Sequence, residues 1–457
     1  MDFLLNMFSY VGWVLLAIMI LVFIHELGHF LFAKLFKMRV EKFSIGFPPK
    51  VLGKKIGETE YVLGLTPLGG YVKITGMVDE SMDTDFAKSE PQPWEFRSKP
   101  VWQRMIVISA GVFFNMVLAA FIFMSLKALY GEAYIPPIGN VYVAENSLAY
   151  DMGLRTGDDL LALNGKPVGN LGGLSALEEA LLADPLTLTV KRGGEEKTFE
   201  GPSDIMTQLG RAGGSFGIAF DPPLVGLVIE GSAAADAGLR AGDRVSAING
   251  TPIHFWNEMT TRIQESGGEP FTLQFERPDS LAGQTLPGAV RVGGSEVGLL
   301  YETMITPQKD GERFVLGVYQ LVRHRKFSLG EALISGVADT WTNTRLIVTS
   351  LKRVFTGQES FRENVGGPIM IAKVTKEAAD RGAPVFWNIV AMLSITLAII
   401  NILPIPALDG GHLVFLLYEG ITRREPSLRV RIVMQQVGMV LLLAFMTFVI
   451  FNDILRL

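Results

Sequence analysis

Four stretches of the chain are apolar over the length that a helix needs to cross a lipid bilayer, about 20 residues. These windows are Met7–Phe36, Val101–Tyr130, Val385–Tyr418 and Ile432–Phe451. The pattern predicts a four-span α-helical transmembrane core, with spans assigned to residues 1–36, 101–130, 384–418 and 432–457. Polar regions of very different length join the spans.

Basic residues mark the side of the membrane on which each polar region lies. Lysine and arginine are frequent near the ends of region 37–100 and in the short loop 419–431. Positively charged loops stay in the cytoplasm. We therefore expect both termini and the long region 131–383 to face outward, which for a chain in the inner membrane of a bacterium with two membranes is the periplasm.

Composition agrees with a membrane protein and excludes several functions. The 457 residues are 49% hydrophobic, with a mean hydropathy of +0.32. A net charge of −5 without a basic run excludes nucleic-acid binding, and the absence of cysteine excludes disulfides and cysteine-ligated zinc. The N-terminal window has no basic residue before it and no cleavage site after it, so we expect it to be retained.

The long polar region contains an internal repeat. Ser147–Asp158 and Ser232–Asp243 share the pattern Ser-x-x-x-Asp-x-Gly-Leu-Arg-x-Gly-Asp, and each is followed at the same offset by Asn-Gly-x-Pro. A short helix stopped by glycine, a Gly-Asp turn, an apolar strand and an Asn-Gly turn predict a small mixed α/β domain. We expect two such domains in tandem, at residues 131–221 and 222–308.

The order of these elements resembles the circularly permuted PDZ domain of bacteria. A PDZ domain binds an extended peptide in a groove between a strand edge and a helix. The resemblance implies peptide ligands in the two grooves and a role in screening substrates. Two inert spacer domains are the alternative, because a fold does not specify what its groove binds.

Region 37–100 contains two β-prone pieces within Tyr61–Lys73, separated by a Pro/Gly turn. They predict a β-hairpin at about residues 58–76. Its apolar character is typical either of a hairpin that enters the membrane beside protein or a cavity, or of a plain cytoplasmic hairpin. The candidate substrate contacts on its exposed edge are Tyr61, Leu63, Leu65, Gly69 and Tyr71.

Region 309–383 is predicted to be helical and amphipathic. Leu333, Val337, Trp341, Leu346 and Leu351 recur at mostly helical spacing within Phe327–Thr356. One or two such helices would lie either on the membrane surface or against the PDZ-like domains.

The first apolar window contains a metal-binding pattern. His25, Glu26 and His29 form an HExxH sequence and are the ionisable residues between Asp2 and Lys34. Residues four apart share one face of a helix, so the two imidazoles can bind one Zn²⁺ with the glutamate beside them. Because hydrocarbon cannot solvate such a face, a bound metal is favoured over a merely polar helix surface.

A third ligand is expected in the third window. The chain has five histidines, and His254 and His324 lie in the periplasmic region. The third window is interrupted by Asn401-Ile-Leu-Pro-Ile-Pro-Ala-Leu-Asp409-Gly-Gly-His412, whose prolines and glycines break a helix. Asp409 is the first candidate ligand, and His412 is a weaker one.

Together, the intramembrane HExxH, the paired PDZ-like repeats and the Asn-x-x-Pro-x-Pro-x-Leu-Asp-Gly-Gly-His motif resemble the site-2 protease family over essentially the whole chain. The resemblance implies zinc held by His25, His29 and Asp409, with Glu26 as the catalytic base. It also implies that Asn401 lies near the substrate backbone and that the hairpin is a membrane re-entrant β-loop. Gly46-Phe47-Pro48 stands where the family has Gly-x-Gly.

The expected activity is hydrolysis of a peptide bond inside a membrane-spanning segment. A water activated by zinc would attack the carbonyl, with Glu26 carrying the proton to the leaving nitrogen. The resemblance implies single-pass substrates, namely an anti-sigma factor in envelope stress signalling and remnant signal peptides. Two other classes stay open: a membrane PDZ adaptor with structural zinc, and a zinc transporter, for which the single broken helix offers no relay of sites.

Overall fold

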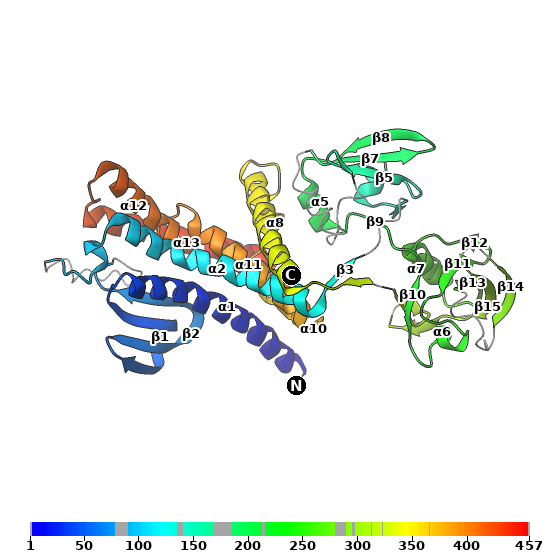
Figure 1. Ribbon diagram of the computed structural model, residues 1–457, viewed down its shortest axis with the longest axis horizontal. Coiled ribbons are helices and arrows are strands. Elements are labelled where there is room, and N and C mark those ends of the chain that lie inside the picture. Colours follow the sequence, from blue (N-terminus) through cyan, green and yellow to red (C-terminus); the bar gives the residue numbers. More distant parts are fainter. Residues whose placement is uncertain are drawn as a thin grey trace. The chain divides into compact units, whose positions relative to one another are not determined.

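The protein is described by a computed structural model over residues 2–77, 90–134, 140–167, 185–212, 215–278, 289–294, 298–311, 313–321, 323–364 and 366–455. The chain divides into two compact units (Figure 1). A mainly helical unit comprises Met1–Gly131 and Lys326–Leu457, and a mainly β unit comprises Glu132–Arg325. Each unit is described by itself.

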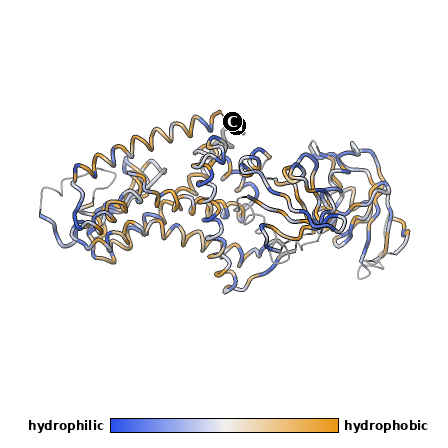
Figure 2. Tube along the Cα trace, turned by 90° about the horizontal axis from the view of Figure 1, so that it is seen from above, coloured by the Kyte–Doolittle hydropathy of each residue, from blue (hydrophilic) through white to orange (hydrophobic). Residues whose placement is uncertain are grey.

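Among its described residues, the helical unit contains four helices that are long and apolar enough to cross a membrane: Gly12–Leu35 within α1, Val101–Tyr130, Ala383–Ile402 and Leu428–Leu455. They fall in the four predicted windows, and the hydropathy colouring of Figure 2 shows them as mostly apolar tubes. The long helices are α1 (Asp2–Leu35), α2 (Val101–Tyr130), α8 (Leu329–Phe355), α10 (Pro368–Asp380), α11 (Ala383–Ile402), α12 (Asp409–Thr422) and α13 (Leu428–Leu455), with the short helices η2 (Phe96–Ser98) and α9 (Phe361–Asn364).

The third predicted window is two helices rather than one. Helix α11 ends at Ile402 and α12 begins at Asp409. Between them lie Pro404 and Pro406, which lack the backbone N–H that a continuous helix requires. The break predicted from these prolines is therefore present, and it places Asp409 at the first position of a new helix.

Small and branched side chains hold α1, α2 and α11 together. Ala17 of α1, Ala119 of α2 and Val390 of α11 are fully buried in one apolar cluster, which lets the helix backbones approach closely. Large side chains elsewhere on these helices, such as Phe113 and Phe121, are more than half exposed. Such exposure of phenylalanine is expected for a surface that faces lipid.

The predicted hairpin is present in a different topology. Strand β1 (Val40–Ile56) and strand β2 (Thr59–Ile74) are joined by a turn at Gly57 and Glu58. Lys42 is opposite both Lys73 and Glu60, and Ile45 is opposite both Gly70 and Leu63. The two β-prone pieces thus lie on either side of β1 instead of pairing with each other. The prediction was wrong here because it considered only the local turn and not strand Val40–Ile56.

The β unit contains two modules with the same order of elements. The first comprises β4 (Tyr142–Val143), α3 (Leu148–Asp151), β5 (Asp159–Leu163), β6 (Lys166–Pro167), β7 (Thr187–Arg192), β8 (Glu195–Glu200), α5 (Ile205–Arg211) and β9 (Ile218–Ala219). Its main sheet has the order β6-β5-β7-β8, and β4 pairs with β9.

The second module begins with β10 (Val225–Val228) and α6 (Ala233–Asp236), and its main sheet has the order β12-β11-β13-β15-β14. The other elements are β11 (Arg244–Ile248), β12 (Thr251–Pro252), α7 (Trp256–Glu265), β13 (Phe271–Arg277), β14 (Ala289–Gly294), β15 (Leu299–Ile305), β16 (Gln308–Asp310), β17 (Arg313–Val315) and β18 (Val318–Gln320). Mixed helix and sheet content is confirmed, whereas the likeness to PDZ domains remains a prediction.

The repeated residues form the same contacts in both modules. Ser147 caps α3, and Ser232 caps α6 in the same way, each accepting a hydrogen bond from the backbone N–H three residues later. Asn164 lies in the tight turn after β5 and Asn249 in the tight turn after β11, and both have a positive φ. The sequence repeat therefore reflects two copies of one local structure.

The predicted end of the second module, at residue 308, lies too early. Strand β18 pairs with β10 from the start of the module, and β19 (Arg323–Arg325) pairs with β3 (Glu132–Tyr134). Residues 309–325, predicted to be helical, contain short strands instead. Strands β16 and β17 pair with each other, whereas the partners of β18 and β19 lie about 90 to 190 residues away in sequence, so local periodicity gave no signal for these two. A single amphipathic helix, α8, follows from Leu329.

Candidate metal centre

Helix α1 presents His25 and His29 on one face, one turn apart. Both residues are 8% exposed, and their Nε2 atoms lie 3.2 Å from each other. The run around them is apolar throughout, so the helix is specified by hydrophobicity and the two imidazoles are its buried polar groups. A four-residue spacing brings them together without any change in the backbone.

Helix α12 supplies the carboxylate that meets the two histidines. Oδ2 of Asp409 lies 3.1 Å from Nε2 of His25 and 3.4 Å from Nε2 of His29. The glycines that follow are required for this close turn, because a Cβ on Gly410 would lie 1.9 Å from the carbonyl oxygen of Leu403. The Asp-Gly pair thus brings the start of α12 back against the end of α11.

The three groups fit a zinc ion. Ligand atoms held 2.0–2.1 Å from a tetrahedral zinc lie about 3.3 Å apart, which matches the separations of 3.1–3.4 Å between the two Nε2 atoms and Oδ2. His29 Nδ1 donates to the carbonyl of Val107 at 2.8 Å, so its Nε2 carries a lone pair. Oδ2 of Asp409 is buried and, among the described residues, accepts no hydrogen bond. Converging lone pairs of this kind are stable around a cation.

Glu26 and Asn401 both lie next to this group. Glu26 is half-buried on α1, and strand β2 passes close to it, since a Cβ on Gly70 would lie 3.3 Å from Cγ of Glu26. Asn401 is buried on the last turn of α11, with Nδ2 3.5 Å from Nε2 of His25. The structure therefore brings together five of the predicted site residues from three helices.

The predicted contacts on β2 are divided between packed and exposed positions. Tyr61 packs against Phe30 and Phe43 with ring centroids 6.0 and 6.1 Å away, and Tyr71 stacks on Phe47. Leu63 and Leu65 are exposed. Gly69 lies under the Phe47 ring, since a Cβ there would approach Cε2 to 2.3 Å. These residues are not all on one free edge.

Gly46 of the Gly46-Phe47-Pro48 sequence keeps a role that only glycine fits well. It has φ of +89°, and a Cβ there would lie 2.9 Å from the carbonyl oxygen of Gly64. The third position, Pro48, is followed by a cis peptide bond to Pro49.

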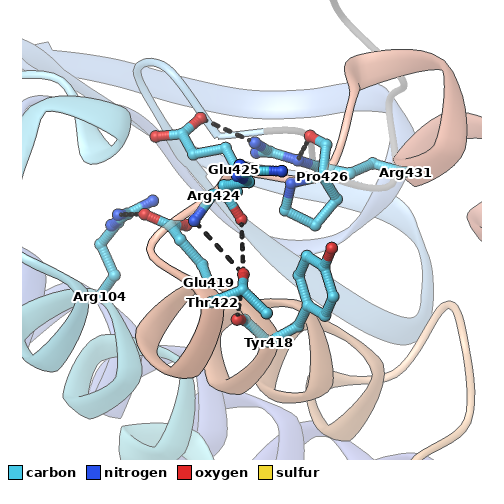
Figure 3. A network of polar contacts seen from close by, with 8 residues as sticks. All are labelled: Arg104, Tyr418, Glu419, Thr422, Arg424, Glu425, Pro426 and Arg431. Atoms are coloured by element: carbon cyan, nitrogen blue, oxygen red, sulfur yellow. Dashed lines mark hydrogen bonds and ion pairs between the residues drawn. The ribbon is translucent and has the colours of Figure 1, made fainter.

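His412 is not part of the three-residue group. It lines a separate cavity together with Arg104, Glu419 and Gln435. Figure 3 shows the polar network beside this cavity, in which Arg104 of α2 forms a buried ion pair with Glu419 of α12. His254 is exposed in the β unit. The preference for Asp409 over His412 as the third candidate therefore agrees with the arrangement.

The sequence reasoning missed the contribution of α2. Val107 accepts the hydrogen bond from His29, Asn115 contacts His25, and Gly111 leaves room for both rings, since a Cβ there would lie 2.4 Å from Nε2 of His29. The available signal was the spacing of Gly111 and Asn115, four residues apart in the middle of a mostly apolar span.

Comparison with known proteins identifies the family. The profile of peptidase family M50 matches residues 13–445. The chain belongs to peptidase family M50. Its relatives include the regulator of sigma-E protease RseP of Escherichia coli K12, which is 31% identical over 100% of both chains. The regulator of sigma E protease of Salmonella typhimurium LT2 is 30% identical over 97% of this chain and 98% of its own.

A Neisseria meningitidis protein whose name contains the words "zinc metalloprotease" is 31% identical over 96% of this chain and 98% of its own. This M50 peptidase is therefore a zinc metallopeptidase with several apolar helices of spanning length.

Proposed function

We propose that the protein is an intramembrane endopeptidase that hydrolyses peptide bonds within membrane-spanning segments of its substrates. The observation that carries this proposal is the convergence of two imidazoles and a carboxylate from two apolar helices, α1 and α12, within a unit of four potential spans. A soluble peptidase has no reason to place two of its metal ligands inside a helix as long and apolar as α1.

His25 Nε2, His29 Nε2 and Asp409 Oδ2 are the proposed zinc ligands. Three protein ligands leave a fourth position open, as is usual in catalytic rather than structural zinc sites. Bound zinc supplies Lewis acidity, which polarises a carbonyl and makes water nucleophilic at neutral pH. Burial of the group by helices keeps bulk water out and strengthens these electrostatic effects.

Glu26 is the proposed general base. Glu26 directly follows His25 on α1, and strand β2 passes close to its side chain at Gly70. From there it accepts the proton of the attacking water and passes it to the leaving amide nitrogen. No covalent bond to the protein is needed in this scheme.

Asn401 and β2 are proposed to hold the substrate in an extended form. A transmembrane helix enters with its carbonyls already hydrogen-bonded, so it must unwind before a scissile bond is accessible. The Asn401 amide offers both a donor and an acceptor beside His25, and β2 offers strand pairing. We assign Leu63, Leu65 and Gly69 to this surface, with Tyr61 and Tyr71 supporting the sheet.

We further propose that the two β modules are PDZ-like domains in the periplasm that screen substrates by the size of their outer domain. The repeated capping and turn contacts support a shared fold for both. The names of the relatives suggest regulation of a sigma-E response. The substrates that we propose are a single-pass anti-sigma factor and, as a second class, remnant signal peptides.

The test compares wild type with Glu26→Gln in detergent micelles or nanodiscs, using a helical transmembrane peptide as substrate. We expect the variant to keep stoichiometric zinc and to lose at least about 100-fold in turnover, because general acid–base catalysis contributes that much or more. Glu377→Gln, an exposed change of the same type on α10, is the matched control and should cleave normally. Zinc-loaded wild type that cleaves no helical substrate would instead favour the adaptor with structural zinc.

A further inference from the structure

Asn115 of α2 is a buried polar residue that the reaction scheme does not use. It is 0% exposed in the middle of an apolar helix, and its Nδ2 lies 3.2 Å from Nδ1 of His25. Its Oδ1 is buried and, among the described residues, accepts no hydrogen bond. An unpaired amide oxygen at this depth is costly and calls for an explanation.

The orientation of this amide determines which nitrogen of His25 carries the hydrogen. If Nδ2 donates to Nδ1, the imidazole hydrogen must sit on Nε2, where it blocks the atom that faces Asp409. If the amide is rotated by 180°, Oδ1 takes the place of Nδ2 and accepts the hydrogen from Nδ1. That rotation pairs the unsatisfied oxygen and frees the lone pair of Nε2 at the same time.

His29 shows the same arrangement already in place. Its Nδ1 donates to the backbone carbonyl of Val107 at 2.8 Å, which leaves Nε2 free. Val107 and Asn115 lie eight residues apart on α2, on either side of Gly111, whose missing side chain accommodates both rings. One face of α2 therefore contacts both imidazoles. At His29 the contact is made by a backbone carbonyl, and at His25 it is made by the side chain of Asn115, which can rotate.

The backbone at Asn115 is also fixed to a third helix. The hydroxyl of Ser394 in α11, itself fully buried, donates to the carbonyl oxygen of Asn115 at 2.8 Å. The position of Asn115 is thereby set by backbone contacts, so the orientation of its amide group can change without moving α2.

We propose that Asn115 is a positioning residue for the metal centre, whose amide oxygen accepts the Nδ1 hydrogen of His25 and so presents Nε2 to zinc. This inference rests on the proposed zinc ligands and extends them to a residue that no motif in the first or third window contains. An acceptor behind a metal-binding histidine fixes the ring and raises its affinity for the metal, typically by a factor of about 10–100.

The test measures the zinc dissociation constant of the full chain in micelles by competition with a chelator. Asn115→Leu, of similar volume but without an acceptor, should raise the dissociation constant about 10–100-fold. Asn115→Asp, which keeps an acceptor oxygen in the same place, should bind zinc at least as tightly as wild type. If Asn115→Asp binds zinc tightly and Asn115→Leu does not, the acceptor oxygen and not the packing of the side chain is responsible, because both variants change the same residue.

Ser394→Ala is the matched control, since it removes a buried hydrogen bond to the same residue but leaves the amide untouched. Its zinc affinity should equal that of wild type. Thermal unfolding of the metal-free variants shows whether each one folds, and Asn115→Asp keeps the test valid if the leucine variant does not.

The outcomes separate this proposal from the proposed function. Wild type and Asn115→Leu binding zinc equally well would overturn the role of Asn115 alone. Weak binding by both Asn115 variants would also overturn it, because an acceptor at that place would then not matter. Wild type that holds no zinc would overturn the ligand assignment, and the role of Asn115 with it.

Discussion

Two buried polar clusters in this protein differ in how their charges are matched. In the second β module, both carboxylate oxygens of Asp243 accept hydrogen bonds from Arg277, at 2.8 and 2.6 Å, and the side chains are 0% and 1% exposed. In the helical unit, Nε2 of His25 and Nε2 of His29 lie 3.1 and 3.4 Å from Oδ2 of Asp409, which accepts no hydrogen bond among the described residues. The Asp243 carboxylate is matched by a guanidinium, whereas Asp409 lies beside two imidazoles, a set of groups that suits a bound cation.

Location in the membrane unit does not explain this difference. Arg104 and Glu419 are buried in the same helical unit and form an ion pair between α2 and α12, as Figure 3 shows. Charged groups between apolar helices are therefore paired where their role is structural. Within the described part of the chain, Asp409 pairs with no lysine or arginine and has the two histidines as its partners, which is why we assign it to metal binding.

The largest expected effect follows from removing the carboxylate of the unmatched cluster. Asp409→Asn should lower zinc affinity by more than about 100-fold and abolish peptidase activity, because a ligand matters more than the groups behind it. Asp453→Asn is the matched control: Asp453 is an even more deeply buried carboxylate of the same helical unit but accepts hydrogen bonds from the backbone of Gly367 and Ile369. It should keep its zinc. Metal analysis of both purified variants decides, and a zinc-loaded Asp409→Asn contradicts the assignment.

Breaking the Asp243–Arg277 ion pair should lower the stability of the second module and leave metal binding unchanged. Arg277→Met leaves the buried Asp243 carboxylate with the Arg240 backbone N–H as a donor but without its counter-charge, so we expect the second module to lose about 3–5 kcal/mol of unfolding free energy. Zinc content should not change. Chemical denaturation followed by circular dichroism measures the unfolding free energy. A variant as stable as wild type would show that this ion pair contributes only to local geometry.

Breaking the equivalent ion pair in the first module should cost less unfolding free energy. Arg192 pairs with Asp158 at 2.6 Å, as Arg277 does with Asp243, but its side chain is 32% exposed. Water can therefore reach the carboxylate once the arginine is removed, and Arg192→Met should cost about 1–2 kcal/mol. The two variants measured side by side give the contribution of burial to the same contact. Equal losses would contradict this explanation.

The smallest expected effect is a pH dependence of the unfolding free energy of the first module. Burial raises the pKa of Asp158, but hydrogen bonds from Arg192 and from the Arg155 backbone lower it more, so the net pKa lies below the usual value. A depressed pKa stabilises the fold above the unfolded value of about 3.9, and this stability is lost as the pH falls through the folded value. In Arg192→Met the loss of stability at acid pH should be smaller than in the wild type, and unfolding curves recorded below about pH 4 measure this difference.

The sequence predicted the parts of the site that follow from local spacing. His25 and His29 are one turn apart on any helix, and Pro404, Pro406 and Gly410 mark the break before Asp409 without knowledge of the fold. The contribution of α2 was missed, because Asn115 lies 90 residues from His25 and the rotation of one helix against another is set by packing.

The fold shows the same limit. Apolar length predicted the four spanning helices, and the repeat predicted two similar β modules. The position of β1 between the two halves of β2 and the pairing of β18 with β10 depend on contacts between distant segments, so they could not be predicted from periodicity.

X-ray absorption at the zinc edge of protein purified without chelator tests the central claim most directly. The account predicts one zinc per chain with two imidazole nitrogens and one carboxylate oxygen at about 2.0–2.2 Å, and loss of the oxygen ligand in Asp409→Asn. A wild-type protein without zinc, or a zinc whose coordination is unchanged in Asp409→Asn, would contradict it.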